Sequence, residues 1–271
     1  MYKRQRLLQN YVRDYPDGKY LAAALLDIAQ SRRAAGDYAE AEAALSRLAT
    51  DRPHSVQYPE ALMMRAEILE NDLPGRAADA ATVYKELEKT GDTDFMADAL
   101  AGVARTSADD NERVAYARRA RNSGGLAPET ADDMRLVEAL ALIRMKQDGE
   151  GTALLGELAA NPSGEAGAQA AVELGQYYLN RREFAKAEKA MLEFTEVGTP
   201  HSLQLARGFL VLADAYTAQG KAYLAKEYLQ SLKENYPGDE REILDGINSR
   251  LKAIGNKNAG GNKKSTGNKK K

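Results

Sequence analysis

Two helical runs of apolar and small residues follow each other between residues 20 and 53. The first run contains Leu25, Ile28 and Ala29, and the second contains Tyr38, Ala41, Leu45 and Leu48. Gly36 separates the two runs and can take the left-handed backbone conformation that ends a helix. Pro53 closes the second run, because proline cannot continue a helix. The pattern therefore predicts a helix, a short turn and a second helix within roughly 34 residues.

The same unit recurs along the chain. Further units are expected at about residues 58–90, 93–123 and 128–161, and in two segments that end at Pro200 and Pro237. An anchor of the second helix recurs in each unit, at intervals of 33 to 39 residues: Ala41, Ala80, Ala117, Leu154, Ala187 and Ala225. A partial helix at 6–15 precedes the first unit, and a helix at about 239–254 with a polar outer face is expected to cap the last. The sequence therefore predicts an all-α solenoid of about six antiparallel helical hairpins with a C-terminal capping helix.

The first unit carries a small residue, Ala29, in its first helix and Gly36 followed by Tyr38 in its turn. Ala41 stands in its second helix, and Pro53 closes it. In these positions the unit resembles a tetratricopeptide repeat. The resemblance implies a right-handed superhelix whose first helices line a concave groove. It also implies a non-catalytic scaffold that binds a protein or peptide partner, without identifying that partner.

Polar residues of the expected first helices are the candidates for contact with a partner. On the tetratricopeptide frame, the residues oriented into the groove are Gln30, Arg33, Glu60, Glu67, Glu70, Gln169, Gln176, Asn180, Arg207 and Asp214. Merely exposed positions on a helix surface show the same residue types, so the pattern leaves both interpretations open. The Lys and Asn set by which some family members clamp the terminal carboxylate of a chaperone is not evident, which disfavours a co-chaperone role.

Charge is distributed unevenly along the chain. The formal net charge is −2, but residues 255–271 contain six Lys and no acidic residue, which leaves −8 on residues 1–254. The composition of the tail predicts disorder, because Ala259 is its only apolar residue. The third unit is locally basic through Arg113, Arg118, Arg119 and Arg121. Together they leave open a second function, binding of an anionic polymer such as nucleic acid or a lipid surface, although the tail lacks aromatic residues that stack on bases.

Few residues of the sequence are suited to catalysis. The absence of Cys excludes disulfides and thiol chemistry. His54 and His201 each stand in a Pro-His-Ser triplet, in which Ser55 and Ser202 are predicted to cap the following helix. No Gly-rich phosphate loop or Gly-x-Ser-x-Gly motif is present, so we expect no enzyme activity, no cofactor and no metal here. An enzyme would need catalytic residues in another part of a longer chain. The sequence contains no apolar run of about 18 residues, so it predicts no transmembrane helix.

The start of the chain indicates a piece of a longer protein. Residues 1–5 resemble the translated adapter of a sequencing library and are expected to be non-native, which assigns the repeat array to residues 6–254. Residues 8–16 resemble residues 229–237, the end of a second helix, so we expect the chain to begin partway through a repeat.

The joints between hairpins carry a narrower resemblance. The Tyr-Pro-Asp-Gly-Lys-Tyr-x3-Ala run at residues 15–24 is similar to joints of envelope repeat proteins, among them the TolA-binding division coordinator and the outer-membrane assembly lipoprotein. The hairpin from Gly208 to Pro237 is similar to the end of large repeat proteins of Bacteroidota. These resemblances imply a scaffold in the bacterial periplasm or cell envelope.

Overall fold

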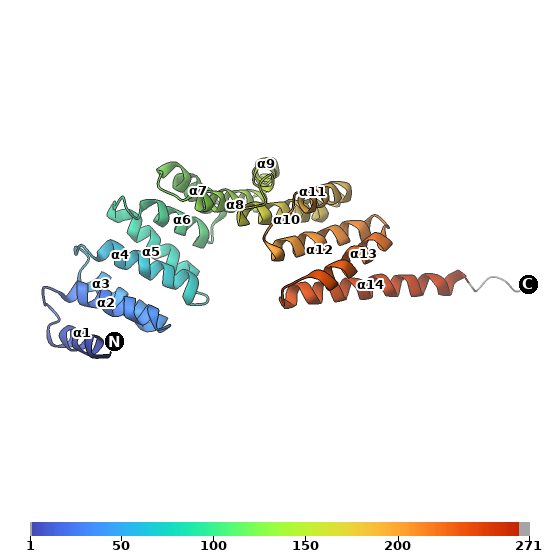
Figure 1. Cartoon of the computed structure of the whole chain (residues 1–271). Helices are drawn as coiled ribbons and strands as arrows, with labels where there is room; N and C mark the ends of the chain where they lie inside the picture. The colour runs from blue at the N-terminus through green and yellow to red at the C-terminus, as the bar shows by residue number, and fades with distance from the viewer. Residues whose placement is uncertain (1, 266–271) are drawn as a thin grey trace, which may run out of the picture. The chain divides into compact units, whose positions relative to one another are not determined.

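The computed structural model describes the backbone of residues 2–265 and the side chains of residues 4–256. This part of the chain contains only helices and connecting loops (Figure 1). The helices are α1 (Tyr2–Asp14), α2 (Leu21–Ala34), α3 (Tyr38–Asp51), α4 (Tyr58–Glu67), η1 (Ile68–Asp72), α5 (Ala77–Thr90), α6 (Met96–Thr106), α7 (Asp110–Ser123), α8 (Pro128–Arg144), α9 (Asp148–Ala159), α10 (Glu165–Asn180), α11 (Phe184–Val197), α12 (Ser202–Ala218), α13 (Ala222–Asn235) and α14 (Arg241–Ser265). The all-α class is confirmed, and the helices follow the expected order from a partial first helix through successive pairs to a final single helix.

Two compact units make up the chain, and the first contains α1 to α8. Within it α2 packs on α3, α4 on α5 and α6 on α7, so each pair forms a hairpin. The second helix of each pair also packs on the next first helix: α3 on α4, α5 on α6 and α7 on α8. Such alternating contacts are typical of a solenoid, in which a hairpin buries its apolar face only against its neighbours.

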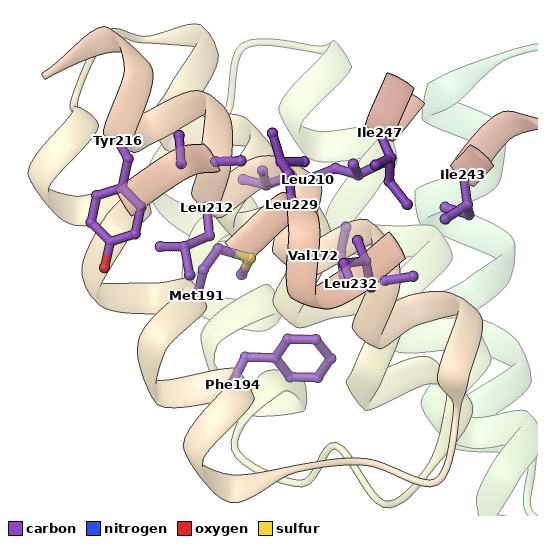
Figure 2. Close-up of a cluster of buried hydrophobic side chains, with 14 of the residues drawn as sticks. Val172, Met191, Phe194, Leu210, Leu212, Tyr216, Leu229, Leu232, Ile243 and Ile247 are labelled. Carbon is purple, nitrogen blue, oxygen red and sulfur yellow. The ribbon is translucent and has the colours of Figure 1, made fainter. Parts of the chain in front are cut away.

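The second unit, residues 148–271, contains α9 to α14. Here α10 pairs with α11 and α12 with α13, while α9 packs on α10. Helix α14 packs on both α12 and α13 and inserts the fully buried Ile243 and Ile247 into their apolar cluster (Figure 2). The expected capping helix is thereby confirmed. The expected fourth hairpin is divided, because α8 belongs to the first unit and α9 to the second.

The two ends of the chain carry predictions that remain untested. Helix α14 extends to Ser265, beyond the expected end near residue 254. The side chains of residues 257–271 and all of residues 266–271 lie outside the described part, so the disorder of the tail stays a prediction. Helix α1 begins within the segment predicted to be non-native, and Arg4 of that segment forms an ion pair of 2.7 Å with Asp27 on α2. The origin of residues 1–5 also stays a prediction.

Small residues mark the places where helices cross. Five predicted anchors of the second helices are completely buried: Ala41, Ala80, Ala117, Ala187 and Ala225. The sixth, Leu154, was wrong, because it is only half-buried while Gly151 and Leu155 are buried. Helix α9 begins at Asp148, which places Gly151 at the fourth helical residue, where α3, α5, α11 and α13 have alanine. A search for apolar residues passes over a glycine in this role.

Two glycines of the first helices allow an aromatic ring of the preceding second helix to approach closely. A Cβ atom at Gly102 would lie 2.5 Å from the Tyr84 ring, and one at Gly208 would lie 2.9 Å from the Phe194 ring. Contacts of this length are too short for any side chain, so both crossings depend on glycine.

Four turns between paired helices share a left-handed backbone conformation but not one residue type. Gly36 and Gly220 have φ angles of 80° and 79° in the first and last turns. At the corresponding turns before α9 and α11, Lys146 and Arg182 have φ angles of 65° and 60°. The left-handed region is unfavourable for residues with a Cβ atom, so these two turns are strained where the glycine turns are not.

The longer turn predicted in the second hairpin contains a π-helix, η1. The amide of Leu73 donates to the carbonyl oxygen of Ile68 at 3.0 Å, which closes a turn one residue wider than in an α-helix. The wide turn keeps Ile68 and Leu69 buried although the connection is longer.

Candidate binding face of the first helices

The ten predicted groove residues all lie on the first helices of hairpins. Gln30, Arg33, Glu60, Glu67 and Glu70 lie on α2, α4 and η1 of the first unit, and Gln169, Gln176, Asn180, Arg207 and Asp214 lie on α10 and α12 of the second. We call the surface that these residues form in each unit the first-helix face. Their contact with a partner stays a prediction.

In the first unit, side chains of this face join one first helix to the next. The Gln30 side-chain amide donates to a carboxylate oxygen of Glu60 at 3.1 Å. Arg33 donates to Glu67 at 2.7 Å. Both pairs connect α2 to α4, and the side chains of the second pair are about one-third exposed. These two pairs hold neighbouring hairpins together. They use side chains that were predicted from the sequence to contact a partner.

Glu70 is the most enclosed predicted residue of the first unit, with a side chain that is 12% exposed. Arg105 on α6 donates to its two oxygens at 2.7 and 3.1 Å, and the Tyr84 hydroxyl donates at 2.7 Å. Burial, followed by the charge and hydrogen bond of Glu70, raises the pKa of Tyr84. Burial alone would lower the pKa of Arg105, but its hydrogen bond with Glu70 and the Glu70 charge raise it on balance. Glu70 therefore connects η1 to α5 and α6.

In the second unit, the face is joined to the capping helix. Arg207 on α12 donates to the two carboxylate oxygens of Glu242 at 3.2 and 3.0 Å. Arg250 on α14 donates to Asp214 at 2.8 and 2.6 Å. The hydrogen bond with Glu242 raises the pKa of Arg207 against the opposing effect of burial, and the Glu173 charge adds to the increase. Two guanidinium–carboxylate pairs therefore join α12 to α14.

The α10 residues of the face are arranged differently. The Gln176 side-chain amide donates to Asn180 one turn later at 2.8 Å, and Gln169 is half-buried on the same helix. Gln176 also lines an open hollow of about 370 Å³ together with Arg207. The lining of this hollow comes from α10, α12 and α14. In the first unit, Gln30 lines a second hollow of about 290 Å³ between α1 and α2.

Gln204 was not predicted and lines the larger hollow from α12. Its side chain is buried, with 6% of the residue exposed. Within the described part of the chain, no group donates a hydrogen bond to its amide oxygen. A buried amide oxygen without a donor is rare in folded proteins.

The partners of the predicted residues were also missed by sequence reasoning. Arg105, Glu242 and Arg250 pair with residues 35, 35 and 36 positions earlier in the chain. A search for opposite charges one repeat apart on first helices would have found all three.

The arginines of α7 bind acidic residues within the first unit. Arg118 and Arg121 both pair with Glu138 on α8, whose side chain is 3% exposed. Arg119 pairs with Glu88 on α5. An anionic polymer that used these arginines would have to break these pairs and expose a buried carboxylate. The geometry therefore disfavours the third predicted hairpin, α6 and α7, as an anion-binding surface.

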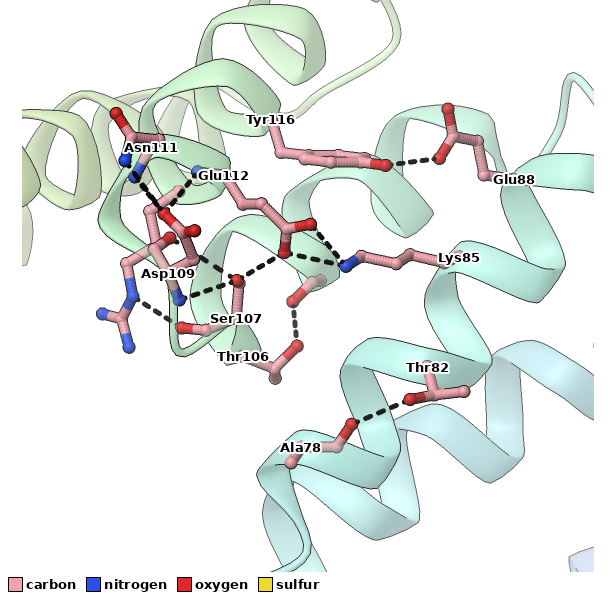
Figure 3. A network of polar contacts seen from close by, with 12 residues as sticks. Ala78, Thr82, Lys85, Glu88, Thr106, Ser107, Asp109, Asn111, Glu112 and Tyr116 are labelled. Carbon is pink, nitrogen blue, oxygen red and sulfur yellow. Dashed lines mark hydrogen bonds and ion pairs between the residues drawn. The ribbon is translucent and has the colours of Figure 1, made fainter.

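The start of α7 is fixed by a polar network (Figure 3). Asp109 caps the helix by accepting hydrogen bonds from backbone amides of its first turn. Lys85 on α5 contacts Glu112 at 2.7 and 2.8 Å, and the Ser107 hydroxyl donates to Glu112 at 2.7 Å. These hydrogen bonds lower the pKa of Glu112, the one from Lys85 most strongly. Arg113, the remaining arginine of the basic helix, donates to the carbonyl oxygen of Ser107 at 2.7 Å.

Two further expectations concern loops and chemistry. The predicted caps were wrong: α4 begins three residues after Ser55, with Gln57 before it, while Ser202 is already the first residue of α12. The ring of His201 contacts the carbonyl oxygen of Ser163 at 3.1 Å.

Among the described residues, no three His, Cys, Asp or Glu side chains are grouped as metal ligands. In the same part of the chain, no helix has the length and apolarity to cross a membrane.

Comparison with known families concerns a hairpin in each unit. Residues 23–55 and 208–239 match the family model of the tetratricopeptide repeat. The first match covers most of α2 and all of α3, and the second covers most of α12 and all of α13. The tetratricopeptide resemblance is thereby confirmed for the first and last complete hairpins.

Two solved structures are similar to this chain. A tetratricopeptide repeat protein from Parabacteroides merdae is 16% identical over 92% of this chain and 90% of its own, with a TM-score of 0.55. PilW, a widely conserved type IV pilus biogenesis factor, is 18% identical over 88% of this chain and 99% of its own, with a TM-score of 0.50. At such identities the likeness shows the fold alone. No curated protein matches the chain.

Proposed function

We propose that this protein is a non-catalytic scaffold that holds a segment of a partner protein along its first-helix face. The observation that carries the proposal is the coincidence, in each unit, of predicted groove residues with an open hollow. Gln30 lines the hollow of the first unit, and Gln176 and Arg207 line that of the second. The tetratricopeptide matches support a protein–protein interaction role, which is the usual role of helical repeat surfaces.

The internal pairs suit this function. Rigid, already bonded side chains lose little conformational freedom when a partner docks, which reduces the entropic cost of binding. The exposed Gln30 uses one N–H for Glu60, and its amide oxygen and second N–H can bond an extended backbone. A partner segment in this position would gain affinity from many weak polar contacts and from the apolar walls of the hollows.

The test is site-specific crosslinking to peptides selected from a displayed random library. A photoreactive residue replaces Gln30 or Gln176 on the first-helix face, and Gln230 on α13 serves as the control because it is exposed on a second helix. Selected peptides should crosslink from the face positions and not from the control. Equal crosslinking from all three positions, or a library that yields no binder, would refute the proposal.

Salt dependence distinguishes the second candidate function. An anionic polymer bound by the basic tail should lose affinity steeply between 50 and 200 mM salt, because counterions are released when phosphates are neutralised. A peptide on the first-helix face should show a weak dependence, because its polar contacts are mostly short-range. Because the α7 arginines are already paired with carboxylates, we expect the weak salt dependence of a bound peptide.

We also propose that the scaffold works in the periplasm or cell envelope of a bacterium. The joint at residues 15–24 supports this location, as does the fold shared with PilW, a pilus biogenesis factor. The test is to sequence the source gene upstream of residue 6. Further repeats preceded by an export signal would agree with the proposal, and a gene that truly begins at Met1 without one would overturn it.

A further inference from the structure

We propose that a hollow between α9 and α11 binds an aromatic side chain of a partner protein, in a segment where Lys or Arg flanks that side chain. Helices α9 and α11 both pack on α10, and residues of all three helices line the hollow, which has a volume of about 300 Å³. We call it the alanine hollow, after four of its lining residues: Ala159, Ala160, Ala171 and Ala190. It shares no lining residue with the hollow that contains Gln176, so this inference goes beyond the proposed function and does not depend on it.

The next hairpin carries two aromatic rings at the corresponding place. Helices α11 and α13 span residues 184–197 and 222–235, so positions 38 residues apart correspond. The same shift relates Ala171 to Phe209 on α12 and Ala190 to Tyr228 on α13. The rings of Phe209 and Tyr228 are stacked, with centroids 5.9 Å apart, whereas the two alanines have only methyl groups.

The two hairpins have hollows at equivalent positions. Five lining residues of the alanine hollow correspond, at this shift of 38, to lining residues of a hollow on α12 and α13. The second hollow contains the rings of Phe209 and Tyr228 in its lining and is smaller, with a volume of about 210 Å³. The fold therefore accommodates aromatic rings at this place in a hairpin, and the alanines of α10 and α11 leave room for a ring from another molecule.

The alanine hollow is apolar and open to solvent. Leu174 lines it from α10, and Phe194, a member of the buried cluster in Figure 2, lines it from α11. Gly156 and Ala160 on the α9 side are exposed, and Val197 at the end of α11 is 70% exposed. A ring inserted here would cover apolar surface of three helices, and buried aromatic side chains are the strongest apolar anchors of protein interfaces.

The rim of the alanine hollow is acidic. Glu193 lines it, and Glu157 on α9 and Glu196 on α11 are exposed and adjoin lining residues in the sequence. Lys189 pairs with Glu193 at 3.6 Å. Within the described part of the chain, no basic residue lines the hollow and none pairs with Glu157 or Glu196. Lys189 thus offsets one of three carboxylates, so Lys or Arg beside the inserted ring complements the rim and an acidic neighbour is repelled.

The test uses three synthetic peptides of one neutral sequence that differ only in their central residues: Lys-Phe-Lys, Lys-Ala-Lys or Glu-Phe-Glu. Binding to the full chain, labelled with ¹³C in its alanine methyl groups, is followed by NMR. The ring protons of the Lys-Phe-Lys peptide should show nuclear Overhauser effects to the methyl groups of Ala171 and Ala190. This peptide should bind about tenfold more tightly than Lys-Ala-Lys, because a phenyl ring is buried, and about threefold more tightly than Glu-Phe-Glu.

Variants that fill the alanine hollow test its role. Ala190→Tyr introduces the ring that Tyr228 supplies in the next hairpin, so it should abolish binding without lowering the urea midpoint. Gly156→Leu fills the hollow from α9, where an added Cβ meets no atom within 4 Å, and should weaken binding even if Ala190→Tyr disturbs its hairpin. As the control, Ala153→Tyr places the same ring at an exposed position of α9 outside the lining and should leave the affinity unchanged. Glu157→Gln removes one rim charge and should weaken binding of the Lys-Phe-Lys peptide about twofold.

Several results would overturn the inference. Equal binding of Lys-Ala-Lys would show that no ring is recognised, and equal binding of Glu-Phe-Glu would exclude the basic neighbours. Overhauser effects only to methyl groups outside the hollow, or full affinity in both filling variants, would place the peptide elsewhere. A dimer of the full chain that Ala190→Tyr dissociates would assign the hollow to a second copy of this protein. Crosslinking from Gln30 and Gln176 is measured separately, so the inference and the proposed function can each fail while the other stands.

Discussion

Replacing Arg182 by glycine should stabilise the protein. Arg182 has a φ angle of 60°, and its backbone amide donates to the carbonyl oxygen of Leu179 at 3.0 Å in the turn before α11. The left-handed conformation costs a residue with a Cβ atom about 1–2 kcal/mol. A glycine loses about 0.5–1 kcal/mol more backbone entropy on folding, so the net gain for Arg182→Gly is about 0.5–1 kcal/mol. The side chain is exposed, and no described residue forms a hydrogen bond or ion pair with its guanidinium, so little is lost with it.

The assay is urea unfolding followed by circular dichroism, combined with hydrogen exchange of the α10 and α11 amides. Hydrogen exchange is needed because repeat proteins can open locally, which a single global transition does not report. Amides of this hairpin that exchange through local opening should slow about two- to fivefold in Arg182→Gly, the kinetic equivalent of about 0.5–1 kcal/mol. Amides of α2 and α3 in the first unit should not change.

Two matched variants separate the backbone from the side chain. Arg182→Ala removes the guanidinium but keeps the Cβ atom, so the free energy of unfolding should stay within about 0.3 kcal/mol of the original. Gly220→Ala introduces the strain at the turn before α13, where the φ angle is 79° and no atom lies within 4 Å of the new Cβ, and should cost about 1 kcal/mol. The reasoning is refuted if Arg182→Ala stabilises as much as Arg182→Gly, or if Gly220→Ala has no effect.

Three further perturbations should destabilise the first unit, each measured by the urea midpoint. Gly102→Ala places a Cβ atom 2.5 Å from the buried Tyr84 ring and should cost about 1–3 kcal/mol through overpacking. Glu138→Ala leaves two arginines without their shared buried carboxylate and should cost about 3 kcal/mol. Acidification should destabilise as well, because hydrogen bonds from Arg144 and Lys85 hold the pKa values of Asp110 and Glu112 below 3.8 and 4.5. Their contribution is complete above about pH 4.5 and is lost as the pH falls through the lowered pKa values.

Controls for these three use the same chain. Gly149→Ala adds a methyl group where no atom lies within 4 Å, and a loss of stability as large as that of Gly102→Ala would contradict the packing argument. Glu138→Gln keeps the shape of the side chain, so a loss as small as that of an exposed substitution would show that the charge pairs do not matter. In Asp110→Asn the acid sensitivity should be smaller, and an unchanged pH profile would assign it to other carboxylates.

The hairpin array could be predicted because its signals are local. Helical periodicity and small residues at crossing points recur along the chain, several turns carry glycine, and Ala41 and Ala225 are completely buried as expected. Leu154 was misassigned because the fourth hairpin has Gly151 at the anchor position of its second helix, and glycine carries no hydrophobic signal. The left-handed conformation of Lys146 and Arg182 could not be predicted, since neither residue type indicates it.

The candidate face was predicted only in part, because its geometry depends on pairs between repeats. Helical phase placed Arg33 and Arg207 on first helices, but periodicity within one helix does not indicate which residue of the next helix each contacts. Gln204 could not be found from the sequence, since the lack of a donor for its amide oxygen is a property of the folded packing.

The pairs between first helices also restrict the order in which hairpins can follow one another. Arg33 meets Glu67 one repeat later, and Arg207 meets Glu242 one repeat later. A tandem copy of the α4–α5 hairpin would not place Arg33 before Glu67, and a copy of the α12–α13 hairpin would not place Glu242 after Arg207. In both cases a charged side chain would lose the opposite charge that it meets now. The face thus works against stacking between identical hairpins of two chains, which is a common way for repeat proteins to misassemble.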